Sequence, residues 1–290
     1  MSRIAYIHGA FVPQADAWVS MEDRGYQFAD GIYEVVPFIA RTPLNMHKHL
    51  TRFARSLAEL GIAEPVKPGA LLLLIRELIR RNARDEGLVY MQVTRGAAAR
   101  NHTWSATLKP VLSMSVLPTR MASAQQRTQG VKVITAPDER WARCDIKSIA
   151  LLPNILARDL SYRQGLRETW LVNAQGQITE GTATNAYIVN AQGVIITHPA
   201  THAILGGVTR EVTLELARMH QLRVEERPFT RADIAQAQEA FLTSASSFVL
   251  PVIAVDGTPV GDGKVGAVTA QLIALYQAAV AAQLPTKKAA

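Results

Sequence analysis

The sequence predicts an α+β protein whose two halves carry different patterns. In the first half, two segments with apolar residues at helical spacing, 47–60 and 69–82, lie between pairs of strand-like segments. This order is typical of an α+β domain with a mostly antiparallel sheet. In the second half, short apolar segments follow one another closely, and Asn-Ala-Gln-Gly at 173–176 and again at 190–193 marks two hairpin turns. This half is predicted to have a barrel-like or sandwich β core.

The elements of the first half follow from local signals. A hairpin opens the chain and turns near Gly9, and a turn-rich loop leads to an apolar strand. The first helix is expected to stop at Gly61, where its apolar periodicity ends. The segments 88–96 and 109–118 are predicted to be strands.

A polar segment, 121–130, separates the halves. It is rich in small residues and shows no apolar periodicity. It is therefore predicted to link a small N-terminal α/β domain, residues 1–120, to a larger C-terminal domain, residues 131–290. Besides its strands, the larger domain is expected to contain helices at about 151–163, 209–220, 230–236 and 266–283.

Composition limits the class of protein. Of the 290 residues, 48% are hydrophobic and 19% are charged, which is typical of a folded protein. The net charge is +7 and the pI about 9.7, but the basic residues are scattered among acids, so a solvated surface is favoured over nucleic-acid binding. No apolar stretch is long enough for a membrane span, and the N-terminus lacks a signal-peptide core. Cys144, the only cysteine, fits a reducing cytoplasm.

The histidines do not predict a metal site. His47 and His49 form one close pair, and His198 and His202 form another. Neither pair has further ligands at plausible spacing, and Pro199 interrupts the helix that the second pair would need. Metal is therefore not expected.

Lys147 is the first candidate for chemistry. It is the only charged residue between 146 and 157. An amine in apolar surroundings has a lowered pKa, which makes it a usable nucleophile and base near neutral pH. Taken alone, the stretch favours a lysine that extends to solvent from a helix start.

Two other segments strengthen the case for Lys147. Glu180, at the end of a predicted strand, is suited to a protonated ring nitrogen, although a surface hairpin glutamate has the same pattern. Gly206 and Gly207 precede a helix that begins near Thr209, and backbone amides at a helix start bind phosphate, although a glycine turn is the simpler explanation. Arg52 could add a positive contact to the phosphate. Lysine, acid and phosphate cradle together are the parts of a pyridoxal phosphate site.

These segments belong to long ungapped blocks that carry a family resemblance. The sequence resembles the class IV, fold-type IV pyridoxal-phosphate aminotransferases, most closely those that act on D-amino acids. The resemblance spans nearly the whole chain and rests on the blocks WVSMEDRGYQFADGIYEVV, RWARCDIKS, TEGTATN, ILGGVTR and GDGKVG. It implies a two-domain fold whose larger, barrel-like domain carries the cofactor lysine. It also implies the cofactor pyridoxal 5′-phosphate and a homodimer.

The resemblance also implies roles for individual residues. Lys147 forms the covalent link to the cofactor, and Glu180 pairs with the pyridine nitrogen. Arg52, Val208 and Thr209 hold the phosphate.

The chain departs from the family pattern at the second phosphate-binding turn. Ala245 stands where the family has a threonine, and Phe248 stands where it has an acid. The phosphate contact is then expected to come from Ser244 or from backbone amides. The family lysine in the ILGG block is Gly206 here. These changes affect the pocket wall rather than the core chemistry.

The resemblance further implies a trap for the substrate carboxylate. Tyr33 lies in Asp-Gly-Ile-Tyr-Glu, and Arg100 and His102 lie in a loop that, in the family, reaches across to the neighbouring subunit. A guanidinium, an imidazole and a phenol can share one carboxylate.

The expected activity is ping-pong transamination between a D-amino acid such as D-alanine and a 2-oxo acid such as 2-oxoglutarate. The alternatives are a branched-chain L-amino-acid transaminase, an (R)-amine transaminase and an aminodeoxychorismate lyase on the same fold. A basic nucleic-acid-binding protein is the rival from another class.

Overall fold

The computed structural model describes residues 3–117 and 121–285, and within them the chain forms two compact units. The N-terminal unit consists of residues 3–117, 146–150 and 283–285. The C-terminal unit consists of residues 121–145 and 151–282. The segment 146–150, which contains Lys147, therefore packs with the N-terminal unit, although the chain before and after this segment belongs to the other unit.

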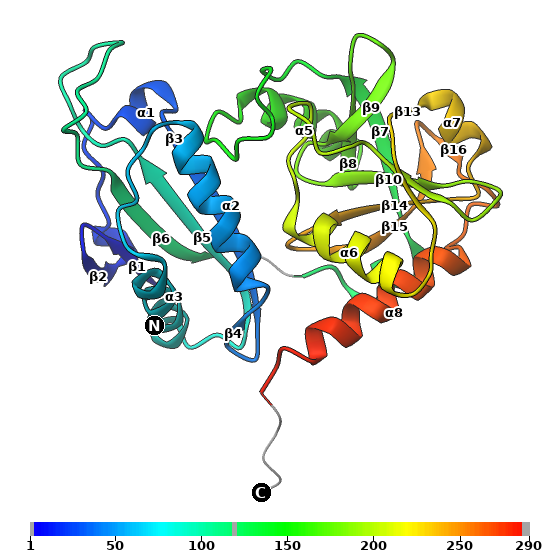
Figure 1. The fold of residues 1–290 in the computed structure, drawn as a ribbon, viewed down its shortest axis with the longest axis horizontal. Coiled ribbons are helices and arrows are strands. Elements are labelled where there is room, and N and C mark those ends of the chain that lie inside the picture. The colour runs from blue at the N-terminus through cyan, green and yellow to red at the C-terminus, as the bar shows by residue number, and fades with distance from the viewer. Residues whose placement is uncertain (1–2, 118–120, 286–290) are drawn as a thin grey trace, which may run out of the picture. The chain divides into compact units, whose positions relative to one another are not determined.

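The N-terminal unit is built on a six-stranded sheet with the strand order β2-β1-β6-β5-β3-β4 (Figure 1). Every pairing in it is antiparallel, as the sequence predicts. Gly9 has a φ of +81° in the turn between the first two strands, a conformation that glycine adopts without strain. The strands are β1 (Ile4–Ile7), β2 (Ala10–Pro13), β3 (Gly31–Ile39), β4 (Thr42–Pro43), β5 (Glu86–Thr94) and β6 (Val111–Leu117).

Two long helices pack on this sheet and confirm the predicted helical segments. The helix α2 (Met46–Glu59) lies on β3, and α3 (Pro68–Asn82) lies against β1 and β6 (Figure 1). Their apolar faces bury residues such as Phe53, Leu57 and Ile75 in one core with the strands. A short 3₁₀ helix, η1 (Gln14–Asp16), and one helical turn, α1 (Arg24–Phe28), were not expected from the sequence.

The C-terminal unit contains a ten-stranded mixed sheet that curls as a half-barrel. Its strand order is β12-β11-β10-β14-β15-β7-β8-β9-β13, with β16 paired to β15. The Asn-Ala-Gln-Gly segments form the two predicted turns, where Gly176 and Gly193 have φ values of +77° and +72°. The strands are β7 (Val131–Pro137), β8 (Glu168–Val172), β9 (Gln177–Gly181), β10 (Asn185–Val189), β11 (Ile195–Thr197), β12 (Val224–Glu226), β13 (Phe229–Thr230), β14 (Glu239–Ser244), β15 (Phe248–Val255) and β16 (Thr258–Pro259).

Five helices accompany this sheet in the described part of the unit. Four of them, α5 (Leu152–Arg163), α6 (Val208–Met219), α7 (Arg231–Gln236) and α8 (Ala267–Ala281), agree with the predicted segments. The fifth, α4 (Ala124–Gln129), lies within the segment predicted to be an aperiodic linker. It is polar, and a capping box between Ser123 and Gln126 starts it, so apolar periodicity gave no signal.

The helices α6 and α8 pack together and against β14 and β15, and α5 packs on β7 and β8 (Figure 1). The unit's apolar core gathers residues from the strands, including Trp170, Ile188, Leu242 and Leu250. Among the described residues, no helix combines the length and the apolar character needed to cross a membrane.

Candidate functional site

Lys147 lies in an extended segment that runs beside β3. Its carbonyl oxygen accepts a hydrogen bond from the Tyr33 N–H at 2.9 Å, and the Ile149 N–H donates to the Gly31 carbonyl at 3.1 Å. On its other side, the Lys147 N–H donates to Ser56 Oγ at 3.3 Å. Backbone bonds thus fix the position of this lysine from two elements of the N-terminal unit.

The amine of Lys147 is half-buried and lies over an aromatic ring. Its Nζ is 4.0 Å from the centroid of the Tyr33 ring, within the range of a cation–π contact. The Tyr33 ring stacks in turn on Tyr90 at 5.7 Å, and burial raises the pKa of Tyr90 to about 12. Since α5 begins only at Leu152, Lys147 is not at a helix start, and it does not extend freely into solvent.

Glu34, a buried acid on β3, bonds side chains of α2 and so holds this helix against the strand. The Glu34 carboxylate is fully buried and accepts hydrogen bonds from Arg52 Nη2 at 2.6 Å, Arg52 Nε at 3.0 Å and His49 Nδ1 at 3.0 Å. Burial alone would raise the pKa of Glu34, but Arg52 and His49 outweigh it and hold that pKa far below its ordinary value. Burial lowers the pKa of His49, with Glu34 opposing that shift. Arg52 is thus oriented by two hydrogen bonds to one carboxylate.

Arg100 and His102 lie in the exposed loop between β5 and β6. The guanidinium carbon of Arg100 is 5.0 Å from the centroid of the Phe28 ring, and the His102 ring is 5.7 Å from the same centroid. The N-terminal unit therefore brings these two residues together on one aromatic side chain. Tyr33, the third predicted member of the carboxylate trap, has Lys147 and Tyr90 as its ring contacts instead.

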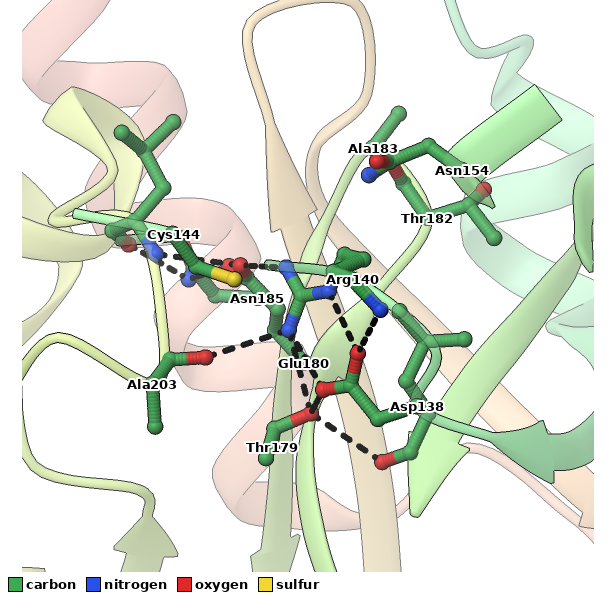
Figure 2. Close-up of polar contacts among 12 residues, drawn as sticks. Asp138, Arg140, Cys144, Asn154, Thr179, Glu180, Thr182, Ala183, Asn185 and Ala203 are labelled. Atoms are coloured by element: carbon green, nitrogen blue, oxygen red, sulfur yellow. Dashed lines mark hydrogen bonds and ion pairs between the residues drawn. The ribbon is translucent and has the colours of Figure 1, made fainter. Parts of the chain in front are cut away.

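Glu180, at the end of β9, is the centre of a polar network in the C-terminal unit (Figure 2). Its Oε1 accepts from Arg140 Nη1 and, at 3.0 Å, from the Leu205 N–H, while Oε2 accepts from Asn185 Nδ2 at 3.0 Å. Burial raises the pKa of Glu180, whereas the ion pair with Arg140 and the Leu205 amide favour the carboxylate. A carboxylate fixed in this way suits a protonated ring nitrogen.

Arg140 is itself held by several acceptors. Its Nε and Nη2 donate to the two oxygens of Asp138 at 2.9 and 2.8 Å, and Nη2 also donates to Thr179 Oγ1 at 3.2 Å and to the Ala203 carbonyl at 3.1 Å (Figure 2). Burial alone would lower the pKa of Arg140, but Asp138 and Glu180 outweigh it and raise that pKa above its ordinary value. The arginine is therefore a permanent cation beside Glu180.

Asn185 connects Glu180 to the start of α6. Its Nδ2 donates to the Leu205 carbonyl at 2.9 Å as well as to Glu180. A Cβ on Gly207 would come within 2.1 Å of Asn185 Oδ1, so glycine is required for this close approach. Gly207 is the N-cap of α6 and provides no side-chain cap, which leaves the first turn with the character of an anion site.

Val208 and Thr209 form that first turn, and both are buried. Ser244 and Ala245 follow at the end of β14, whose Thr243 pairs with Asn185 on β10. The C-terminal unit thus places the predicted phosphate-binding residues close to the residue that bonds Glu180. Ser244 Oγ accepts from the Ser247 N–H at 3.2 Å, which stabilises a tight turn.

Phe248, which replaces the family's acid, has a φ of +55° and stacks on Tyr276 at 5.0 Å. An apolar contact therefore anchors the end of this turn. Ser244 has its hydroxyl at the turn.

Taken separately, each unit offers groups that suit pyridoxal phosphate. The C-terminal unit offers a buried, hydrogen-bonded carboxylate in Glu180 and an uncapped start of a twelve-residue helix. The space around Gly206 would accept a Cβ without contact. Thr184 Oγ1, four residues from Glu180, is buried and has no hydrogen-bond partner within the described residues. The N-terminal unit offers the amine of Lys147. No group of three or more potential metal ligands occurs among the residues that the structure describes.

Four residues of these networks were given no role from the sequence, namely Glu34, His49, Arg140 and Asn185. Three of them stand at fixed positions within the motif blocks, Glu34 after Tyr33, Arg140 at the head of RWARCDIKS and Asn185 at the end of TEGTATN. Polar residues inside apolar blocks were a usable signal, but their partners lie up to 63 positions away in the sequence.

Comparison with known proteins gives a consistent result. Residues 31–255 match the family described as amino-transferase class IV. The chain is 36% identical to the D-alanine aminotransferase of Bacillus licheniformis, covering 90% of this chain and 92% of the relative. It is 39% identical to the D-alanine aminotransferase of Listeria monocytogenes, with 92% of both chains covered.

Two solved structures that superpose on this chain are named branched-chain amino acid aminotransferases. The branched-chain amino acid aminotransferase of Escherichia coli superposes with a TM-score of 0.89 at 21% identity, over 99% of this chain and 97% of that one. The T.th. branched-chain amino acid aminotransferase, complexed with N-(5′-phosphopyridoxyl)-L-glutamate, superposes with a TM-score of 0.86 at 25% identity, over 98% and 96% of the two chains.

Proposed function

Since the chain belongs to the class IV amino-transferases, enzymes that use pyridoxal phosphate, we propose that it transfers an amino group from a D-amino acid, such as D-alanine, to a 2-oxo acid, such as 2-oxoglutarate. The observation that carries this proposal is the 36–39% identity, over about nine-tenths of the chain, to relatives named D-alanine aminotransferase. The presence of Tyr33, Arg100 and His102 in the motif positions supports the same substrate class.

In this proposal Lys147 would hold the cofactor covalently through its amine. Glu180 would accept a hydrogen bond from the pyridine nitrogen, and its negative charge would keep that nitrogen protonated. Arg52, the amides of Val208 and Thr209, and Ser244 with the backbone of Ala245 would hold the phosphate. When bound, the cofactor withdraws electrons from the substrate and so acidifies its Cα–H bond.

The Lys147 amine would also act as a base and an acid. It would take the proton from the substrate Cα and later return it, so one side chain would serve in both roles. Its segment is bonded to Tyr33 and Ser56, which supports a fixed direction of proton transfer. Because the amino group stays on the enzyme between two half-reactions, the kinetics are ping-pong.

The carboxylate trap determines the chirality of the substrate. Tyr33, Arg100 and His102 anchor the carboxylate on one side, and this anchor decides which Cα substituent faces Lys147. We further propose a homodimer in which the loop carrying Arg100 and His102 serves the neighbouring subunit.

Exposed apolar side chains support an assembly of two copies. Leu152, Ile155, Leu156 and Leu160 on α5 are between 47% and 66% exposed, which is a large apolar face for a helix in water. Their spacing puts them on one side of the helix. Sedimentation equilibrium measures the assembly directly.

The two compact units support a two-domain organisation. We propose that a small domain formed by residues 1–120 and a larger one formed by 131–290, whose sequence carries the cofactor lysine, are joined by 121–130; the short segment 146–150 of the larger one packs with the N-terminal unit. A cytoplasmic location is supported by the single cysteine, Cys144, which is unpaired.

Transamination of branched-chain L-amino acids is the second candidate. It is favoured by the close superposition on the T.th. enzyme, with a TM-score of 0.86. An (R)-amine transaminase and a lyase acting on aminodeoxychorismate share the same cofactor chemistry and are distinguished by the same experiment.

The test is a donor panel. Purified enzyme is mixed with 2-oxoglutarate and D-alanine, D-aspartate, L-leucine, L-valine or (R)-1-phenylethylamine, and in a separate reaction with aminodeoxychorismate alone, and the keto product is quantified. We expect pyruvate from D-alanine and glutamate of D configuration. Product from the L-amino acids alone would replace the proposal with the branched-chain activity, and pyruvate release from aminodeoxychorismate without any amino acceptor would indicate the lyase.

A further inference from the structure

The loop that carries Arg100 and His102, residues 96–108 (the trap loop), is mostly exposed and joins β5 to β6. An exposed loop of this length has many accessible conformations, which would spread its two side chains over many positions. A carboxylate anchor needs fixed donors, because small misplacements of bound substrate reduce the rate strongly. Something other than burial must therefore restrict the trap loop.

Arg24, the first residue of α1, bonds the loop at three points. Its side chain is only 4% exposed. Its Nη1 donates to the Asn101 carbonyl at 2.6 Å and to the Thr103 carbonyl at 3.4 Å, the two carbonyls on either side of His102. Its backbone N–H donates to the Gly96 carbonyl at 2.9 Å, where the loop begins.

Phe28, the last residue of the same helical turn, lies under the side chains of the trap loop. The centroid of its ring lies 5.0 Å from the Arg100 guanidinium and 5.7 Å from the His102 ring. The Arg24 guanidinium also contacts this ring, at 4.8 Å from the centroid. An aromatic face attracts a guanidinium without satisfying its N–H donors, so the donors of Arg100 can still bind a carboxylate.

The helical turn itself is rigidly attached to the sheet. Asp23 caps it by accepting from the Gly25 N–H at 2.8 Å, and its other oxygen accepts from Thr94 Oγ1 at 2.8 Å. A Cβ on Gly25 would come within 2.2 Å of Thr94 Cγ2, so α1 lies in direct contact with β5.

A second arginine completes the base of the loop. Asp30 accepts from Arg24 Nε and from Arg95 Nε, both at 2.8 Å, and these two cations hold the pKa of Asp30 below its ordinary value against the effect of burial. Trp104 of the trap loop lies over Arg95 at 4.2 Å and over Arg24 at 5.5 Å. The loop is thus attached both through its carbonyls and through this indole.

We propose that Arg24 and Phe28 are positioning residues that fix the trap loop and thereby set the preference for one enantiomer of the substrate. This inference rests on the proposed function, because it assumes that Arg100 and His102 bind the substrate carboxylate. Arg24 sets the backbone on both sides of His102, and Phe28 sets the direction of Arg100 and His102.

The experiment compares Arg24→Lys and Phe28→Leu with wild type, with Arg100→Ala as the reference for loss of the trap. Arg81→Lys is the matched control, because Arg81 also lies over an aromatic ring, Phe11 at 4.5 Å, but away from the loop. Each holoenzyme is assayed for kcat and KM with D-alanine and L-alanine, and its melting temperature is recorded. Trypsin cleavage after Arg100 is followed by mass spectrometry.

We expect both positioning variants to raise KM for D-alanine by about tenfold, the effect of losing one good charged contact, with kcat changed far less. The ratio of D- to L-alanine turnover falls, and cleavage after Arg100 becomes faster, while Arg81→Lys matches wild type in all readouts. If Arg24→Lys does not fold, Phe28→Leu, which keeps an apolar side chain, still tests the inference.

The inference is overturned if Arg100→Ala is impaired but the positioning variants keep the wild-type KM for D-alanine, the wild-type D-to-L ratio and the wild-type cleavage rate. A wild-type enzyme inactive on D-amino acids, or an Arg100→Ala variant with normal KM, would instead overturn the proposed function and this inference with it. The two failures are therefore distinguishable.

Discussion

Replacing Arg140 by methionine tests the polar network around Glu180. The Arg140 and Glu180 side chains are each 6% exposed and Asp138 is 10% exposed, so the variant leaves two buried carboxylates without their shared cation. Removing one partner of a buried ion pair costs about 3–5 kcal/mol, because the remaining charge is uncompensated. The expected loss in the free energy of unfolding at pH 7 is therefore about 3–5 kcal/mol, or roughly 10 °C in melting temperature.

The loss in the free energy of unfolding caused by Arg140→Met should become smaller as the pH falls. Arg140 holds the pKa of Asp138 below its ordinary value, against desolvation. A group with a lowered folded-state pKa contributes stability that is present above its unfolded pKa and lost as the pH falls through the folded pKa. In the variant, both carboxylates can be protonated without breaking a pair. The difference from wild type is therefore full at pH 7 and shrinks below about pH 4.

Urea titration of the cofactor-free proteins, followed by circular dichroism, measures this difference at pH 7 and at about pH 3. The matched control is Arg163→Met, because the Arg163–Asp159 pair on α5 is exposed, at 77% and 42%. That variant should lose about 0.5 kcal/mol or less. The reasoning fails if Arg140→Met loses no more than the control, or if its loss grows as the pH falls.

Three further outcomes follow from the geometry. Glu34→Gln should lower the free energy of unfolding by about 3–5 kcal/mol at pH 7 and by less below about pH 4, since the pKa of Glu34 is strongly lowered. Urea titration at the same two pH values as for Arg140→Met checks this prediction, and equal losses at both would contradict it. Gly207→Ala should weaken cofactor binding by at least about tenfold, because its Cβ displaces Asn185, whereas Gly206→Ala has open space and should bind like wild type; fluorescence titration with pyridoxal phosphate separates them. Tyr33→Phe keeps its ring contacts and should melt like wild type but raise KM for D-alanine about fivefold; a normal KM would remove Tyr33 from the trap.

The regular elements were largely predictable because their signals are local. Apolar periodicity predicted α2, and α3 and four helices of the C-terminal unit were also expected at their positions. The two Asn-Ala-Gln-Gly turns formed where they were expected. The α1 turn was missed because it depends on Asp23 bonding Thr94, 71 positions away, which no local pattern records. The α4 helix was missed because a polar capping box, not an apolar face, defines it.

The candidate residues were predictable, whereas their supporting contacts were not. Lys147, Glu180 and Arg52 stand in sequence blocks that resemble one family. The ion pair between Arg140 and Glu180 and the bonds between Glu34 and Arg52 join residues from different elements, so they need the folded chain. The environment of Lys147 was also misjudged locally, since its segment pairs with β3 rather than beginning a helix.

The central claim is that Lys147 carries the cofactor, and one measurement tests it directly. The enzyme is loaded with pyridoxal phosphate, reduced with borohydride, digested and mapped by mass spectrometry. Reduction makes the link between amine and cofactor permanent, so the modified peptide identifies the lysine. We expect the phosphopyridoxyl mass on Lys147 alone; a label on another lysine, or no label at all, would contradict the account.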